Sequence, residues 1–255
     1  VAVEVNPEII YSCAPEQTGK DTPAGIALPA LMGGMNGLNL TQDVADAFYM
    51  ADGTNYSLPE NHWEAIGVDK KFSGYTLKAS AAKMYDNREV RFYVAIGFNH
   101  CLWPGTSYTG NDNTLRNVEV QYYSDGNAGP PANFAVDYNH SGYTCKKYVH
   151  VEDNLKGSLK PKFFPIFRYA EILLNYVEAL NELEGSYTEG EITVTGRDEE
   201  EILDAFNQVR YRAGLPGLTS LPSKEEMKSL IKQERRVEFV CEGHRYHDIR
   251  RWGDA

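Results

Sequence analysis

Apolar residues recur every three or four positions in three stretches of the C-terminal part of the chain, residues 165–185, 198–216 and 223–243. This spacing places them on one face of an α-helix. In the first stretch the repeating positions are Ile166, Ala170, Leu173, Val177 and Leu180, with Leu174 and Tyr176 widening the stripe. The pattern predicts three amphipathic helices, the first two forming an antiparallel pair joined by residues 186–197.

The residues at the ends of these stretches are of the kinds that start and stop helices. Asp198 and Ser223 each precede a glutamate by three positions, which is the spacing of a capping box. Gly214 and Gly243 lie at the C-terminal ends of the second and third stretches, where a glycine in the left-handed conformation ends a helix. The segment HRYHDIRRW after Gly243 predicts a further short helix, whose Trp252 we expect in the core.

The N-terminal part of the chain, residues 1–160, is rich in Gly, Asn, Tyr and Pro, and these residues favour turns. A short helix is predicted at 41–53, where Thr41 can cap the first turn and an Asp-Gly pair closes the last. Alternating β-branched and aromatic residues predict strands at 88–98 and 117–124. The segments 99–115 and 124–133 are predicted to be loops.

Composition and charge exclude several classes of partner. The formal net charge of this 255-residue chain is -11, so nucleic acid and anionic membrane surfaces are disfavoured. No apolar run approaches the roughly 20 residues that a membrane helix needs. The four cysteines form no CxxC pair, which argues against a zinc knuckle. The opening VAVEVNPEII lacks Met and signal-peptide features, and one helix pair is too few for a stable solenoid, so we expect the chain to be part of a longer protein.

The last segment, ERRVEFVCEGHRYHDIRRWGDA (234–255), concentrates charge, aromatics and two histidines. A metal site could use His244, His247 and Asp248, and an acid–base pair could use Glu242 with His244. We favour a third interpretation, an ion-paired structural joint, because arginine pairs bidentately with carboxylates and keeps its charge when partly buried. The arginines concerned are Arg245, Arg250 and Arg251.

Three stretches of the chain resemble the SusD/RagB family of nutrient-binding outer-membrane lipoproteins. They are RYAEILLNYVEALNEL (168–183), AFNQVRYRAGLP (205–216) and the Glu-Arg-Arg, Glu-Gly-His-Arg and Asp-x-x-Arg-Trp pattern of residues 234–255. Weaker similarities lie at 48–56, 85–98 and 141–149. The resemblance therefore runs through most of the chain in the family's order.

The resemblance implies a mostly α fold in which tetratricopeptide-like helix pairs support an irregular, loop-rich part with a few short strands. Residues 1–160 would be the loop-rich, ligand-binding part and residues 161–255 the helical scaffold of the same domain. It also implies a protein that is not an enzyme and has no cofactor. Such a protein is lipid-anchored at the cell surface and captures oligosaccharides, or peptides in some branches, for a SusC-like TonB-dependent transporter. The N-terminal lipid anchor and the C-terminal end would be missing from this chain.

Candidate ligand contacts are aromatic residues in loops beside amides, because sugars stack their C–H faces on rings and hydrogen-bond through their hydroxyls. The residues predicted on this basis are Trp103, Trp63, Tyr108, Tyr56, Asn36 and Asn39. Three alternatives remain open: a peptide-binding member of the same family, a helical scaffold for protein partners, and a glycoside hydrolase. Hydrolysis needs a matched pair of carboxylates, and nothing pairs the loop residues Asp112, Asp125 and Asp137. Calcium binding to Asn/Asp-rich loops is conceivable, although no EF-hand spacing is present.

Overall fold

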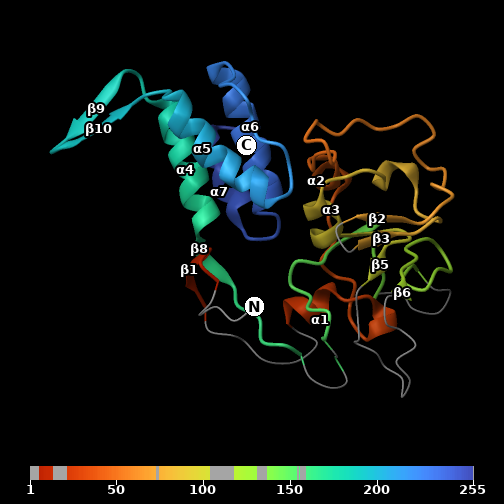
Figure 1. Ribbon diagram of the computed structural model, residues 1–255. Coiled ribbons are helices and arrows are strands. Elements are labelled where there is room, and N and C mark those ends of the chain that lie inside the picture. Colours follow the sequence, from red (N-terminus) through yellow and green to blue (C-terminus); the bar gives the residue numbers. More distant parts are fainter. Residues whose placement is uncertain are drawn as a thin grey trace. The chain divides into compact units, whose positions relative to one another are not determined.

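The computed structural model describes residues 6–13, 22–72, 75–103, 118–130, 137–153, 155 and 159–254. The described residues separate into a helical unit, formed by 6–13 and 163–254, and a loop-rich unit, which lies between 22 and 162 in the sequence (Figure 1). The division expected from the sequence placed the first strand in the loop-rich part. In the structure β1 (Ile9–Ser12) pairs antiparallel with β8 (Pro165–Arg168), so it belongs to the helical unit.

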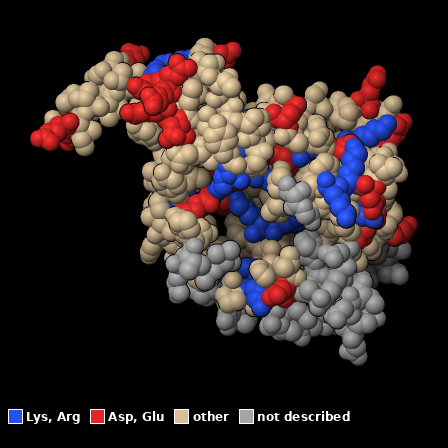
Figure 2. Space-filling model, in the orientation of Figure 1, with Lys and Arg blue, Asp and Glu red and all other residues tan. Residues whose placement is uncertain are grey.

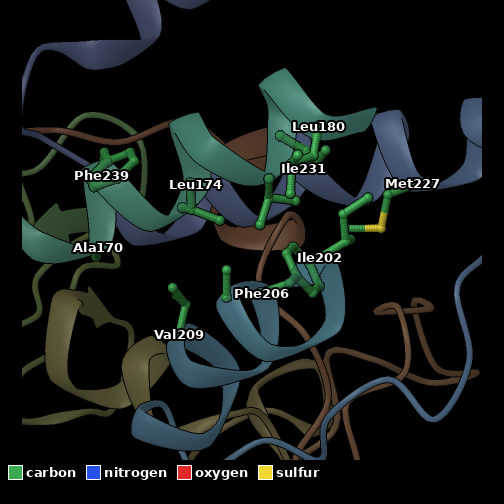
Figure 3. Close-up of a cluster of buried hydrophobic side chains, with 11 residues drawn as sticks. Ala170, Leu174, Leu180, Ile202, Phe206, Val209, Met227, Ile231 and Phe239 are labelled. Atoms are coloured by element: carbon green, nitrogen blue, oxygen red, sulfur yellow. The ribbon is translucent and has the colours of Figure 1, made fainter. Parts of the chain in front are cut away.

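The helical unit is built from four helices and two small sheets in the part of the chain that the structure describes. After β8 the elements are α4 (Tyr169–Glu182), β9 (Ser186–Glu189), β10 (Ile192–Thr195), α5 (Glu199–Arg212), α6 (Lys224–Glu238) and α7 (His244–Trp252). The apolar stripes of α4, α5 and α6 meet in one buried cluster, shown in Figure 3. Its members include Leu174, Leu180, Ile202, Phe206, Met227, Ile231 and Phe239. The helices predicted from the apolar period are confirmed.

The start of the first predicted helix is wrong by four residues. Residues 165–168 are extended in β8, and α4 begins only at Tyr169. The backbone of this segment is hydrogen-bonded to β1, and Ile166 and Phe167 are exposed. Strand pairing with a distant segment has therefore overridden a local pattern that also fits a helix.

The N-terminal capping predictions hold for α5 and α6, whereas the side chain of Thr41 makes no capping hydrogen bond at the helix predicted for 41–53. The Asp198 carboxylate accepts the backbone N–H of Glu201 at 3.0 Å. At α6 the hydroxyl of Ser223 accepts from the N–H of Glu226 at 3.3 Å, while the Glu226 carboxylate accepts from the N–H of Ser223 at 3.0 Å, which completes the capping box. Gly243, expected to end this helix, instead precedes the first residue of α7 with φ 86°, because α6 already ends at Glu238.

The loop-rich unit has short elements held together by a buried aromatic core. They are α1 (Pro23–Ala27), α2 (Gln42–Asp46), β2 (Lys70–Phe72), β3 (Tyr75–Leu77), α3 (Val90–Ala95), β4 (Ile96–Phe98), β5 (Leu102–Trp103), β6 (Val118–Glu119) and β7 (Tyr143–Cys145). The described strands pair antiparallel in twos: β2 with β3, β4 with β7, and β5 with β6. Phe48, Tyr49, Phe92 and Phe98 are fully buried among them. No helix in the described ranges is both long and apolar enough to span a membrane.

The strand predicted at 88–98 is half wrong, because residues 90–95 form the helix α3 and only 96–98 form a strand. The alternation that suggested a strand would bury Val94, but its side chain is exposed. The buried residues of α3 are instead Phe92, Tyr93 and Ala95, and Phe92 and Ala95 have the three-residue spacing of one helix face. The predicted helix at 41–53 is present but shorter, as α2.

Candidate functional site

The site centres on the segment 54–66 of the loop-rich unit, which carries the exposed ring of Trp63. The Trp63 side chain is 65% exposed, and its ring meets His62 edge-on with centroids 4.6 Å apart. The backbone beneath it is fixed: the N–H of Lys83 donates to Glu64 O at 2.8 Å, and the N–H of Met84 donates to His62 O at 3.1 Å. An exposed indole on an anchored backbone is a preorganised surface for stacking, since little entropy is lost when a ligand binds.

Tyr56, in the same segment, is positioned by a buried arginine. The guanidinium carbon of Arg88 lies 3.8 Å from the centre of the Tyr56 ring and 4.5 Å from that of Phe92. Arg88 is itself held by backbone carbonyls, including that of Phe48 at 2.9 Å. Burial lowers the pKa of Arg88, while burial raises the pKa of Tyr56 to about 12. The Tyr56 hydroxyl therefore stays protonated at neutral pH and can donate a hydrogen bond.

The cavity beside Tyr56 has a volume of about 320 Å³ and is lined by both polar and apolar residues. A larger cavity, of about 640 Å³, lies in the helical unit. The residues lining the cavity beside Tyr56 are Met50, Tyr56, Ser57, Pro59, Ile66, Lys83, Asp86 and Asn87. Two polar atoms of this lining, Tyr56 Oη and Asp86 Oδ1, are buried without a hydrogen-bond partner among the described residues. A buried polar atom left unpaired is costly, so a ligand that supplied a partner here would gain free energy.

The charged groups around this cavity are paired with one another. Asp86 forms an ion pair with Lys70 through its other carboxylate oxygen, and Glu64 Oε2 lies 2.6 Å from Lys83 Nζ. The lining is thus polar with little uncompensated charge. Such a cavity suits a neutral ligand with hydroxyl or amide groups.

Trp103, the preferred candidate from the sequence, is not on the surface. Its side chain is 0% exposed, and it lies in β5 against Gly97, where an added Cβ would come within 2.6 Å of Trp103 Cζ3. The expectation that a Trp before Pro-Gly stays accessible was therefore wrong, because pairing of β5 with β6 turns the ring into the aromatic core. A buried ring cannot stack on a sugar.

The predicted amides have structural partners. Asn36 is fully buried, and its Nδ2 donates to the carbonyl of Asp137 at 3.1 Å. The backbone of Asn39 forms an isolated β-bridge with Thr144. The side-chain oxygen of Asn39 accepts a hydrogen bond from the N–H of His140 at 3.2 Å. Both asparagines thus fasten loops of the unit. Of the sequence-predicted residues, the structure brings Tyr56 and Trp63 together in one segment.

Two tyrosines of the segment 118–130 differ in exposure, and the last predicted ligand residue lies outside the described part of the chain. Tyr122 is buried, with its N–H bound to Asn99 Oδ1 at 2.9 Å, whereas Tyr123 is exposed beside His100 with ring centroids 5.7 Å apart. Tyr108 lies outside the described residues, as do Asn111 and Asp112.

Sequence reasoning missed Arg88, Lys83 and Asp86 at this site. They lie in the segment KMYDNR (83–88), where Asn87 adopts φ 53° and turns the chain. An Asp-Asn pair in a charged stretch is a turn signal that could have marked the segment. The pairing of this segment with 62–66 has no local signature, because it depends on backbone hydrogen bonds between distant residues.

The C-terminal corner is an ion-paired joint, formed by Arg235 and Arg251. Of the other arginines expected there, Arg250 lies over the ring of Tyr246, 4.2 Å from its centroid. Arg235 binds Asp248 through two nitrogens, at 2.9 and 3.0 Å, and Arg251 binds both Asp248 and Glu178. Arg168, which the sequence reading did not single out, contacts Glu238 at 2.6 Å. The indole of Trp252, expected in the core, is half-buried and donates to Glu178 at 2.7 Å. Among the described residues no three His, Cys, Asp or Glu side chains lie close enough to hold a metal ion.

Comparison with known proteins places this geometry in a family. SusD-like protein P38 of Formosa agariphila is 33% identical over 102 residues, which cover 40% of this chain and 19% of that protein. A SusD-like protein of known structure from Bacteroides fragilis has a TM-score of 0.72 at 27% identity, covering 98% of this chain and 44% of its own. A SusD-like carbohydrate-binding protein from the same species shares the fold, with a TM-score of 0.65 at 22% identity over 97% of this chain and 42% of that one.

This chain therefore spans less than half the length of these relatives. A model of the SusD family matches residues 11–255. Because that match covers nearly the whole chain, the chain belongs to the SusD family.

Proposed function

We propose that this chain captures oligosaccharides without cleaving them, through the site formed by Trp63, Tyr56 and the adjoining cavity. The observation that carries the proposal is the exposed indole of Trp63 on a backbone segment that is hydrogen-bonded to Lys83, a residue lining the polar cavity. An oligosaccharide can place the C–H face of one sugar on this ring, while hydroxyls of the chain bond to the Tyr56 hydroxyl and the Asp86 carboxylate in the cavity. No other described segment combines an indole exposed to this extent with such a cavity.

The carboxylates at the site support binding over hydrolysis. Glycosidases use two carboxyl groups across the scissile bond, one of which donates a proton. Here Glu64 and Asp86 are each ion-paired with a lysine, so both carboxylates already have a charged partner within the chain.

Family membership supports the cellular role that we propose for the whole protein. In this proposal the protein is lipid-anchored at the outer surface of the outer membrane and passes its ligand to a SusC-like TonB-dependent transporter. Since the chain spans less than half of its solved relatives, other parts of the protein can add to the ligand contacts.

The proposal is tested by titrating the chain with a panel of neutral oligosaccharides and short peptides, using calorimetry and iodide quenching of tryptophan fluorescence. Trp63 is the most accessible of the three indoles, so a bound glycan should protect it from iodide. Trp63→Ala should weaken binding by about tenfold or more, the equivalent of about 1.4 kcal/mol. Tyr246→Ala, at an exposed aromatic residue of α7, is the control and should leave binding unchanged.

Three outcomes would change the assignment. Binding of glycans that is unaffected by Trp63→Ala would place the site elsewhere in the protein. Release of reducing sugar by the pure protein would contradict a non-catalytic role. Binding of peptides alone would favour the peptide-binding alternative, for which the charged cavity residues Lys83 and Asp86 offer partners.

A further inference from the structure

The connection between α4 and α5 is a protruding β-hairpin whose strands have no other partner in the described part of the chain. β9 and β10 pair only with each other, with Tyr187 opposite Val194 and Glu189 opposite Ile192. The hairpin is tied to the helices at its base, where the N–H of Gly196 donates to Gly185 O at 2.6 Å. It extends away from the helix ends (Figure 1). An isolated two-stranded hairpin is only marginally stable in water, so this hairpin depends on contacts beyond its own two strands.

The register gives the hairpin two chemically different faces. Residues opposite each other share a face, so one face carries Tyr187, Glu189, Ile192 and Val194. The other face carries the hydroxyl residues Ser186, Thr188, Thr193 and Thr195. On the hydroxyl face Oγ1 of Thr188 and Thr193 lie 3.0 Å apart. The first set is called the apolar face below.

The apolar face is anchored at one end and open at the other. Val194 packs against the buried cluster of α4, α5 and α6, which fixes the orientation of the hairpin. Tyr187 is 58% exposed and Ile192 is 71% exposed, the largest exposed fraction among the described large apolar side chains. Exposed tyrosine and isoleucine on an oriented sheet face are typical of a contact surface rather than of a solvated loop.

The segment that carries this face is rich in acidic residues, of which Glu182 is ion-paired with Lys224 and Lys228. The segment 182–201 contains eight acidic residues and one basic residue. The basic residue, Arg197, is occupied by Asn181 and by the carbonyl of Pro222, the latter at 2.6 Å. Figure 2 shows acidic side chains gathered over the end of the helical unit that carries the hairpin. Glu189 lies on the apolar face itself, and Glu191 is exposed in the turn between the strands.

This charge decides what can cover the apolar face. An anionic membrane surface or a nucleic acid would be repelled by the glutamates. A second copy of the same hairpin would bring Glu189 and Glu191 against their own counterparts, which costs free energy. A protein surface with lysine and arginine around an apolar centre fits both the charge and the exposed side chains.

We propose that the apolar face of the β9–β10 hairpin docks on a partner protein through an apolar depression edged by basic side chains. Tyr187 and Ile192 fill the depression, while Glu189 and Glu191 pair with the basic edge. The acidic surround accelerates the encounter and disfavours partners without that edge. This contact is independent of the Trp63 site, which lies in the other unit.

Photo-crosslinking in the cells that produce the full-length protein tests the proposal. p-Benzoylphenylalanine replaces Tyr187 on the apolar face, and in control proteins it replaces Thr193 on the opposite face or the exposed Tyr211 of α5. We expect a crosslink from position 187 alone, mapped by mass spectrometry to an apolar segment flanked by lysine or arginine. Glu189→Lys or Glu191→Lys should reduce the yield by about fivefold or more, since each reverses a contact charge.

Charge reversal on the partner makes the result specific. Changing the mapped basic residues to glutamate should restore the crosslink of Glu191→Lys and abolish that of the wild type. Asp204→Lys, an equal change of charge at an exposed position of α5, should leave the yield unchanged. Glycan binding should be unaffected by the hairpin variants, so failure here is distinguishable from failure of the proposed function. Equal crosslinking from all three positions, capture of a second copy or of lipid, or indifference to charge reversal would overturn the proposal.

Discussion

Trp103 and Lys146 are two buried residues of the loop-rich unit that lie close together in its aromatic core. Trp103 lies between Gly97 and the side chain of Lys146, whose ammonium is 5.9 Å from the indole. Lys146 is buried as well, and its Nζ donates to the carbonyl of Tyr93. The aromatic core therefore encloses a cation whose nearest partners are rings and a carbonyl, a combination that the sequence pattern does not reveal.

Trp103→Ala should destabilise the loop-rich unit by about 3–5 kcal/mol, because it removes a fully buried ring and leaves a cavity. Urea unfolding followed by circular dichroism measures the loss. Trp63→Ala, which removes an indole of the same size from the surface, should change the free energy of unfolding by less than about 0.5 kcal/mol. Equal effects of the two changes would contradict the burial of Trp103.

Lys146→Met should change the pH dependence of stability. Burial lowers the pKa of Lys146 below its ordinary value of 10.5, so the unfolded chain binds this proton more readily than the folded one. The free energy of unfolding of the wild type therefore increases as the pH rises from the folded-state pKa of Lys146 to about 10.5. The Met variant lacks this gain, and its advantage over the wild type should be larger at pH 7 than near the ordinary lysine pKa. Parallel pH profiles of the two proteins would show that Lys146 is not penalised by burial.

At the scale of elements, the joint between α4 and α7 depends on one carboxylate. Glu178 of α4 accepts from the indole N–H of Trp252 at 2.7 Å and from Arg251 Nη2 at 2.6 Å. Burial would raise the pKa of Glu178, but these hydrogen bonds and the charge of Arg251 together lower the pKa below 4.5. The motif at the C-terminus is therefore used to hold one helix against another.

Glu178→Gln should lower the free energy of unfolding of the helical unit by about 2 kcal/mol at neutral pH, the scale of hydrogen bonds to a charged group. A carboxyl whose folded pKa is lowered stabilises the fold above its unfolded pKa, near 4.5, and this contribution is lost as the pH falls through the folded pKa. The difference between variant and wild type should therefore shrink on acidification. Urea titrations at several pH values measure it, and a difference that grows in acid would contradict the assignment.

The elements that the sequence predicts well are those whose boundaries are set locally. The caps of α5 and α6 lie where Asp198 and Ser223 predicted them, since a side chain bonding to a backbone N–H three residues away is a short-range interaction. The start of α4 and the helix α3 were mispredicted because each local sequence fits both a strand and a helix. Pairing with β1 decides the first case, and packing in the aromatic core decides the second. The candidate site was half predictable for the same reason. Tyr56 and Trp63 share one loop, whereas Arg88 reaches Tyr56 only through tertiary packing.

At the scale of the whole molecule, the first described segment, residues 6–13, belongs to the helical unit, which the chain enters again at residue 163. β1 and Glu8, the residue before it, bind the start of α4 through backbone hydrogen bonds and an ion pair. The N–H of Tyr169, the first residue of α4, donates to the carbonyl of Glu8 at 2.7 Å. Arg168 Nη1 lies 2.8 Å from the Glu8 carboxylate and 2.6 Å from that of Glu238. A segment far away in sequence thus completes the start of the scaffold helix.

Deletion of residues 1–14 should therefore weaken the helical unit selectively. β8 loses its partner strand, the first turn of α4 loses the Glu8 carbonyl, and Arg168 keeps only its partners on the α6 side. Hydrogen–deuterium exchange should show faster exchange in peptides covering 165–175, with protection retained in 90–98 of the loop-rich unit. Glu8→Gln, which preserves the strand pairing but removes the charge, should produce a smaller change at the same peptides. Equal loss of protection in both units would show that they unfold as one, and unchanged exchange in 165–175 would show that β1 contributes nothing to the scaffold.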